Sequence, residues 1–311
     1  MHKAYSSVSM TDQSTEICLP MIKGVTASKA FLDGSTPSNS IYAYLCQQFP
    51  HISPNEWQQR FNDGLVYSHL GEVLNIDAPF TANQHVYYYR FLAHEIHVPF
   101  QHKILFENDD LLVVDKPHFL TMSPTGKYIQ ETLLVRLKNE TQNPDLTPIH
   151  RLDRETAGVV LFAKTVASRA AYQQMFAERK VDKTYHAIAP VHPTLQFPLT
   201  TQYRMEKGEP FYTMHVVDGN INSTTHINLI AQKDGLAKYL LMPVTGKQHQ
   251  LRVHLSQLGI AILNDPLYPT VQHKVDDDFS APLQLLAKSI TFIDPITQQK
   301  MYFESDFDLT L

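Results

Sequence analysis

The sequence lacks the features of a membrane protein, a secreted protein or a cysteine-based metal site. No apolar run approaches the roughly 20 residues of a bilayer-spanning helix, and no basic segment leads into an apolar one at the N-terminus. The chain has only two cysteines, Cys18 and Cys46, with neither CxxC spacing nor a disulfide framework. These absences predict a cytoplasmic protein without membrane association.

The chain also lacks an excess of positive charge. Its 26 Lys and Arg face 31 Asp and Glu, so its formal net charge is −5 at pH 7. This balance argues mildly against RNA binding, because affinity for phosphates comes from Lys and Arg. Cations nevertheless concentrate in one stretch: Arg151, Arg154, Lys164, Arg169, Arg179, Lys180 and Lys183. A basic cleft on an acidic protein is consistent with that clustering.

Residues 150–158, which read His-Arg-Leu-Asp-Arg-Glu-Thr-Ala-Gly, are the most informative segment. They set Asp153 between two arginines, next to an apolar run that must be buried. Such charges are costly to bury unless they pair with one another or with a ligand. Taken alone, an aspartate flanked by arginines is more often a structural ion pair than a catalytic group, so both interpretations stay open at this point.

Hydrophobic patterning predicts an α+β fold with a mixed, largely antiparallel sheet. The apolar run 159–163 does not alternate, which predicts a strand covered on both faces and places Asp153 on a loop at the rim of the sheet. The other predicted strands cover residues 104–106, 111–115, 184–191, 240–242, 290–293 and 301–303. Helices are predicted over 131–137, around Tyr172, and after Thr245-Gly246.

Two further motifs follow the first. Residues 183–185 read Lys-Thr-Tyr, and residues 245–252 read Thr-Gly-Lys-Gln-His-Gln-Leu-Arg. The three motifs, in this order, resemble the signature of the large-subunit-type (RluA-like) RNA pseudouridine synthases. The resemblance implies that Asp153 is the catalytic aspartate, Tyr185 the active-site tyrosine, and Arg252 the arginine that pairs with the aspartate.

The same resemblance implies a substrate-binding surface. Arg151 matches the position credited with filling the space that an extruded uridine leaves, and Leu251 would be an apolar platform for the base. The remaining predicted substrate-binding residues are His150, Arg154, Lys247 and His249. Isomerisation of uridine involves no oxidation, hydrolysis or cofactor. We therefore predict no cofactor, and no metal, since no histidine pair has zinc-binding spacing on a clear helix.

Some segments depart from the family pattern. Residues 118–120 are His-Phe-Leu where a Gly-Leu or Gly-Phe pair is usual. Residues 261–269 keep Asp265 and Tyr268 but lack the accompanying glycines, and Asp294 stands where a histidine is usual. None of these positions is predicted to carry the chemistry. They indicate a divergent branch, whose substrate should not be transferred from relatives.

Three regions are predicted along the chain. Residues 1–35, rich in Ser and Thr, form a partly ordered extension, and residues 98–311 form the catalytic domain. Residues 36–97 predict two helices, a Gly turn and short strands, which resembles a small, degenerate S4-like RNA-binding module. Its second helix offers Arg60 and few other cations, so an RNA-binding module and a structural appendage both stay open.

Together the motifs predict a monomeric RNA pseudouridine synthase that acts on ribosomal or transfer RNA, with ribosomal RNA favoured. One alternative is a catalytically silent RNA-binding protein on the same scaffold; binding alone would require none of Asp153, Tyr185 and Arg252. A carboxylate-based glycosidase using Asp153 and Glu155 is disfavoured, because two positions on one loop have no reason to adopt the separation that this chemistry needs.

Overall fold

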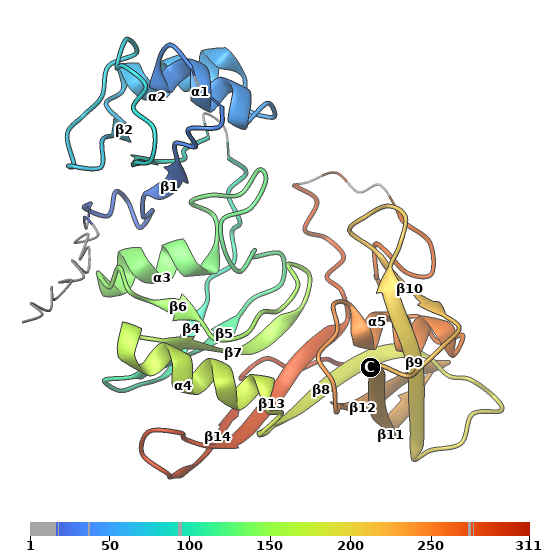
Figure 1. Ribbon diagram of the computed structural model, residues 1–311. Coiled ribbons are helices and arrows are strands. Elements are labelled where there is room, and N and C mark those ends of the chain that lie inside the picture. Colours follow the sequence, from blue (N-terminus) through green and yellow to red (C-terminus); the bar gives the residue numbers. More distant parts are fainter. Residues whose placement is uncertain (1–16, 18, 37, 93–94, 273–274, 276) are drawn as a thin grey trace, which may run out of the picture. The chain divides into compact units, whose positions relative to one another are not determined.

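The computed structural model describes residues 17, 19–36, 38–92, 95–272, 275 and 277–311. Its contacts divide the chain into two compact units, residues 1–91 and 92–311 (Figure 1). Residues 1–16 of the predicted extension, and Cys18, lie outside the described residues. Within the described part of the chain, no helix is both long and apolar enough to span a membrane.

The N-terminal unit contains two helices and a three-stranded antiparallel sheet. The helices are α1 (Ile41–Gln48) and α2 (Pro54–Asn62), and the strand order is β1 (Ser28–Phe31), β3 (His85–Tyr88), β2 (Val66–Tyr67). Ser53 begins α2 with a capping box to Glu56. Since β1 belongs to this sheet, the unit extends back into the predicted extension of residues 1–35.

Arg60 on α2 packs inside this unit. Its guanidinium carbon lies 4.7 Å from the centre of the Trp57 ring, and its residue is only 8% exposed. A buried cation over an indole contributes to packing and is not presented to phosphate. The order of elements is consistent with an S4-like module, but RNA binding by this unit stays a prediction.

The larger unit is built on one mixed, 11-stranded sheet, which confirms the predicted fold class. Every strand pairing in it is antiparallel except that between β13 and β7. Across the sheet the strands are β10 (Met214–Val217), β9 (Leu199–Lys207), β11 (Ser223–Lys233), β12 (Leu236–Pro243), β8 (Val181–Pro190), β13 (Leu285–Ile293), β7 (Ala157–Ala163), β5 (Leu111–Lys116) and β4 (Lys103–Glu107). In addition, β14 (Lys300–Glu304) pairs with β13 and β6 (Thr147–Pro148) with β7.

Helices cover both faces of β7, as its unbroken apolar run predicts. On one face, Val160 and Phe162 share a core with α3 (Leu133–Thr141); on the other, Leu161 shares a core with α4 (Val166–Ala177). The third helix, α5 (Gln250–Gln257), packs Leu251 and Leu255 on the half of the sheet formed by β8, β11 and β12. The sheet centre, β8-β13-β7, thus carries the loop of Asp153 and the strand of Tyr185 (Figure 1).

Gly158 explains the small residue at the end of the first motif. Its φ is +113°, and a Cβ there would lie 2.2 Å from the carbonyl oxygen of Ala287 on β13. Only glycine allows this approach, which forms the parallel pairing of β7 with β13. Where the family usually has glycines, two non-glycine residues adopt positive φ: Phe119 at +66° and Asn264 at +63°. The loop backbone is therefore left-handed there without glycine.

Candidate active site

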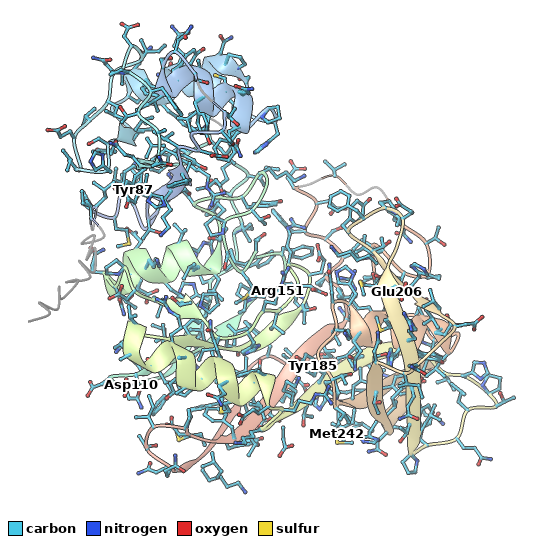
Figure 2. All side chains as sticks on the ribbon, in the orientation of Figure 1. Tyr87, Asp110, Arg151, Tyr185, Glu206 and Met242 are labelled. Atoms are coloured by element: carbon cyan, nitrogen blue, oxygen red, sulfur yellow. The ribbon has the colours of Figure 1, made fainter. Side chains whose placement is uncertain are left out.

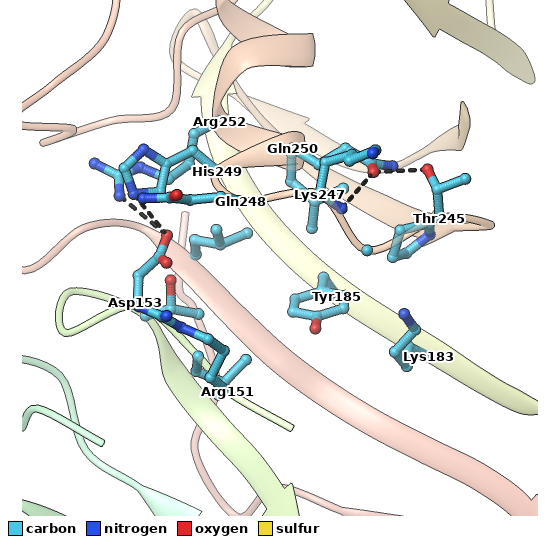
Figure 3. Close-up of a pocket in the computed structure, with 16 residues that line it drawn as sticks. Arg151, Asp153, Lys183, Tyr185, Thr245, Lys247, Gln248, His249, Gln250 and Arg252 are labelled. Carbon is cyan, nitrogen blue, oxygen red and sulfur yellow. Dashed lines mark hydrogen bonds and ion pairs between the residues drawn. The ribbon is translucent and has the colours of Figure 1, made fainter. Parts of the chain in front are cut away.

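Asp153 lies on the loop before β7 and faces Arg252 on α5 (Figure 3). Arg252 Nη1 donates to Asp153 Oδ2 over 3.1 Å. The arginine side chain is 1% exposed and that of Asp153 is 21% exposed, so the pair has one buried and one accessible member. The accessible member is the carboxylate, as a reaction with a bound molecule would require.

A second carboxylate, Asp265, holds Arg252 from behind. Arg252 Nε and Nη2 donate to its two oxygens over 2.8 and 2.7 Å, and the Asp265 side chain is fully buried. The two carboxylates raise the pKa of the guanidinium against the opposing effect of burial. Because Asp265 binds Nε and Nη2, the orientation of the guanidinium is fixed and its remaining nitrogen, Nη1, faces Asp153.

His249 also faces Asp153, with Nε2 3.7 Å from Oδ2. Its Nδ1 lies 2.8 Å from the Tyr268 hydroxyl, and that hydroxyl oxygen accepts the Met214 backbone N–H over 2.8 Å. Burial lowers the pKa of His249, so the imidazole is neutral at pH 7. Among the described residues, Nδ1 is the one acceptor at hydrogen-bonding distance from the Tyr268 O–H. Donation of this O–H to Nδ1 leaves the proton of His249 on Nε2, facing Asp153.

Both donors meet the same oxygen of Asp153. Arg252 Nη1 and His249 Nε2 face Oδ2, and no described residue donates to Oδ1. The carboxylate is thereby oriented with one oxygen held and the other available to a ligand.

Tyr185 lies near the middle of the same cavity, on β8 (Figure 3). Its ring packs against the core clusters on both sides of the sheet centre. Burial, and then the negative charge of Asp153, raise the pKa of its hydroxyl well above the ordinary value of 10. The phenol is therefore protonated at neutral pH and is a hydrogen donor.

The cavity that these residues share has a volume of about 180 Å³. Its walls combine the first motif (Arg151, Leu152, Asp153), the second (Lys183, Tyr185) and the third (residues 245–252). A larger trough of about 1040 Å³ adjoins it and shares Arg151, Asp153 and His249. All three sequence motifs thus converge on one small, partly apolar cavity that opens beside a larger trough.

Comparisons with known proteins agree with this geometry. Residues 110–257 match the family model described as RNA pseudouridylate synthase. The chain is 32% identical over 203 residues to the dual-specificity RNA pseudouridine synthase RluA of Vibrio parahaemolyticus, a match covering 62% of this chain and 78% of that protein. This chain belongs to the RNA pseudouridine synthase family.

Other members of the family match over different lengths. The human pseudouridylate synthase RPUSD2 is 32% identical over 181 residues, which are 54% of this chain but only 31% of that protein. The solved structure of human RNA Pseudouridylate Synthase Domain Containing 1 superposes with a TM-score of 0.54 at 25% identity, covering 67% of this chain and 84% of that one. The pseudouridine synthase fold is therefore shared.

The third family motif forms a loop that Gln250 ties to the sheet. Gln250 Oε1 accepts from Thr245 Oγ1 over 2.7 Å and from the Lys247 N–H over 3.1 Å (Figure 3). Its Nε2 donates to the Thr224 carbonyl over 3.0 Å. This buried amide shapes the loop so that Lys247 is exposed at the cavity rim and Leu251 lines its wall.

The remaining predicted substrate-binding residues are divided between the two hollows. Arg151 is exposed and lines both of them. Arg154 lines the trough and lies over the rings of Tyr128 and Phe119 at 5.2 and 5.7 Å. His150 also borders the trough, but its Nε2 accepts the Leu161 N–H over 3.2 Å and its ring stacks on Phe176 at 4.5 Å. Burial lowers the pKa of His150 to about 3, so it is a neutral structural acceptor.

Asp265, Tyr268 and Lys116 are site-supporting residues that the sequence reasoning missed. Lys116 ends β5 fully buried, and its Nζ donates to the carbonyls of Pro117, Leu120 and Arg154 over 2.9, 2.9 and 3.2 Å. Burial lowers its pKa to about 7. Lys116 thus ties the loop after β5 to the residue next to Asp153. The sequence does carry signals for these three residues: Lys116 belongs to a Lys-Pro pair, and Asp265 and Tyr268 are the positions of 261–269 that keep the family pattern.

Among the described residues, no three His, Cys, Asp or Glu side chains are grouped as metal ligands would be. The carboxylates at the site are already engaged by the guanidinium of Arg252. The arrangement supplies a carboxylate, a protonated phenol and fixed donors, which are the groups needed for proton movement and for stabilising developing charge.

Proposed function

We propose that this protein isomerises uridine in RNA to pseudouridine, with Asp153 as the catalytic carboxylate. The observation that carries the proposal is the convergence of Asp153, Tyr185 and Arg252, from a loop, a strand and a helix, on one cavity. A protein that only binds RNA would need none of the three in this arrangement. The silent alternative is therefore disfavoured by geometry as well as by family membership.

The reaction breaks the N1–C1′ bond and joins the same ribose carbon to C5 of the uracil; C5 then loses its proton and N1 gains one, so the composition is unchanged. Asp153 lines the cavity, and because Arg252 and His249 face its Oδ2, Oδ1 is the oxygen left for the substrate. Tyr185, protonated and lining the same cavity, is positioned to donate or relay a proton. Leu251 offers the freed base an apolar surface while the cavity excludes water.

RNA enters through the trough in this proposal. Arg151 lies at the junction of trough and cavity, where it would occupy the space vacated by an extruded uridine. Lys247 would contact the backbone from the opposite rim. We further propose that the protein acts as a monomer in the cytoplasm, on ribosomal RNA in preference to transfer RNA, and without a cofactor.

The test is Asp153→Asn, with Asp182→Asn as the matched control on the exposed face of β8. Both proteins would be incubated with ribosomal and transfer RNA from cells that lack the protein, and pseudouridines mapped. We expect Asp153→Asn to abolish formation while binding RNA nearly as tightly as wild type, because one neutral carboxyl changes chemistry more than a phosphate-binding surface. Residual formation at the wild-type rate would reject the proposal, and modified transfer RNA alone would reject the ribosomal preference.

A further inference from the structure

Strands β9 and β10 form a hairpin whose tip, residues 208–213, reads Gly-Glu-Pro-Phe-Tyr-Thr. The tip is held by its own hydrogen bonds. Gly208 N donates to the Thr213 carbonyl over 3.0 Å, and Thr213 N and Oγ1 both donate to the Pro210 carbonyl over 2.8 Å. A Cβ at position 208 would lie 2.6 Å from Thr213 Oγ1, so the turn is tightly closed. The two residues between Pro210 and Thr213 are therefore presented on a well-defined turn.

Those two residues are aromatic and exposed. Phe211 is 79% exposed and Tyr212 is 38% exposed, and their ring centres lie 5.5 Å apart at 79°. Leaving a phenyl ring in water forfeits the free energy that its burial would provide. Two such rings side by side on an ordered turn are typical of a surface that another molecule covers.

The hairpin tip lies beside the proposed active site, which indicates that the covering molecule is the substrate RNA. Tyr212 lines the trough that also contains Arg151 and Asp153. Figure 2 labels Arg151, which lines the trough, and Glu206 on β9, the strand that leads to the tip. The hairpin base is fixed to the site, because Met214 and Val253 of α5 share a core cluster and the Met214 N–H donates to Tyr268. The aromatic tip is thus held at the wall of the trough that opens on the proposed catalytic carboxylate.

We propose that Phe211 and Tyr212 stack on an unpaired base of the RNA, a neighbour of the target uridine. This inference rests on the proposed function. The exposed Lys247 at the cavity rim supplies a cation for the backbone and the hairpin tip supplies aromatic faces, which is the combination that single-stranded RNA binds. A base in a duplex has no free face to offer, so the proposed substrate is a loop, bulge or locally opened strand.

Stacking and phosphate contact are distinguishable by salt. Neither Phe211 nor Tyr212 carries a charge, so the slope of log affinity against log salt should be unchanged in the double variant Phe211→Ala/Tyr212→Ala. Its affinity for RNA should nevertheless weaken by about 5- to 150-fold at every salt concentration, the range for one lost base stack. Lys247→Gln is the opposite control: removing one proposed phosphate contact should reduce the salt slope by about one. The loss in the aromatic variant should fall on KM, with far less effect on kcat.

Phe211→Trp supplies an independent readout. The chain has one tryptophan, Trp57, which is fully buried in the N-terminal unit. A tryptophan at position 211 should therefore report base stacking as RNA-dependent quenching, and this variant should retain wild-type affinity. Tyr302→Ala, at a 58% exposed tyrosine on β14, is the matched control and should change neither affinity nor turnover.

Three results would each overturn the inference: wild-type affinity in the double alanine variant, a reduced salt slope in it, or unquenched fluorescence of Phe211→Trp at saturating RNA. Thermal unfolding of the double variant guards against misfolding, and it should match wild type because both side chains are exposed. Failure of the proposed function is separate. If the wild-type protein forms no pseudouridine while the aromatic variants still lose RNA affinity, the activity is rejected and the stacking surface stands.

Discussion

Arg252 is bound more completely by Asp265 than by its proposed catalytic partner, Asp153. Two of its nitrogens donate to Asp265, and only Nη1 reaches Asp153. Asp265 also accepts the backbone N–H groups of Leu267 and Tyr268 over 2.8 and 3.2 Å, so its position is fixed independently of the arginine. The buried ion pair of Arg252 and Asp265 therefore fixes the guanidinium so that Nη1 faces the accessible carboxylate of Asp153.

This arrangement predicts that Arg252→Ala destabilises the protein strongly, by about 3–5 kcal/mol, because it leaves the buried Asp265 carboxylate without its cation. Activity should be lost as well, since the oriented donor to Asp153 is gone. Urea unfolding and single-turnover rates measure the two effects. Asp153→Asn is the comparison, because its side chain is partly exposed and its removal should affect the rate alone. An unchanged free energy of unfolding in Arg252→Ala would contradict a stabilising role for the buried Arg252–Asp265 pair.

Tyr185→Phe should lower the single-turnover rate, because it removes the hydroxyl that is proposed to donate a proton in the cavity. Stability and RNA affinity should stay near wild type, because the ring still packs against the core. Tyr239→Phe is a matched control with the reverse expectation. Its hydroxyl donates to the Pro190 carbonyl over 2.9 Å, so its loss should cost about 0.5–1.5 kcal/mol of stability and leave the rate intact. A normal rate in Tyr185→Phe would assign that residue to packing.

The contact between Tyr268 and His249 predicts a change in pH dependence. The groups facing His249 are Asp153, Arg252, Asp265 and Glu155. In Tyr268→Phe the neutral imidazole is no longer held with its proton on Nε2, and turnover should fall at pH 8. As pH falls below the ordinary histidine value of 6.5, the imidazolium carries protons on both nitrogens, and the rate of the variant should recover relative to wild type.

His249→Gln separates this effect from a general loss of structure. Its amide also donates toward Asp153 but does not titrate, so its rate relative to wild type should be independent of pH over the same range. Single-turnover rates from pH 5.5 to 8 provide the measurement. Parallel profiles for wild type and Tyr268→Phe would show that the hydroxyl does not control the tautomer.

His150 predicts a pH dependence of stability. Burial lowers its pKa from 6.5 to about 3 in the folded protein, so between these values the unfolded chain binds a proton that the folded protein does not. Stability should therefore fall as pH falls below 6.5, by up to about 1.4 kcal/mol per pH unit from this residue. His150→Gln lacks the titrating ring, so its stability should fall less steeply. Urea unfolding at pH 7, 6 and 5 would compare them, and equal slopes would contradict a buried neutral His150.

The sequence predicted the parts of the fold whose signals are local. The unbroken apolar run of β7 and the position of α5 directly after the Thr245-Gly246 turn were sufficient for their assignment. Strands β9, β10 and β11 were missed because they lie toward one edge of the sheet, where polar and exposed residues interrupt the apolar pattern.

The candidate site shows the same division. The motifs placed Asp153, Tyr185 and Arg252 together because the family resemblance links residues far apart in sequence. The contacts of Arg252 with Asp265 and of His249 with Tyr268 have no such motif behind them, because Asp265 and Tyr268 lie outside the three motifs. The pairing of Asp265 with Arg252 depends on how a loop folds back on a helix, for which one sequence carries no local signal.

The boundary of the catalytic unit leads to the last prediction. Contacts place it between Phe91 and Leu92, whereas the sequence suggested Val98. The difference includes Glu95, whose carboxylate accepts the backbone N–H groups of Ile129, Gln130 and Glu131 over 2.6, 3.0 and 2.8 Å. A fragment beginning at Leu92 should therefore fold and keep the residues of the reaction, while one beginning at Val98 leaves three N–H groups without their acceptor and should be less stable by about 1–3 kcal/mol.

Full-length Glu95→Gln is the control, since it weakens the same contacts without shortening the chain. Equal unfolding midpoints for the two fragments would deny Glu95 this role, and a folded Leu92 fragment that is inactive at saturating RNA would show that the N-terminal unit takes part in catalysis.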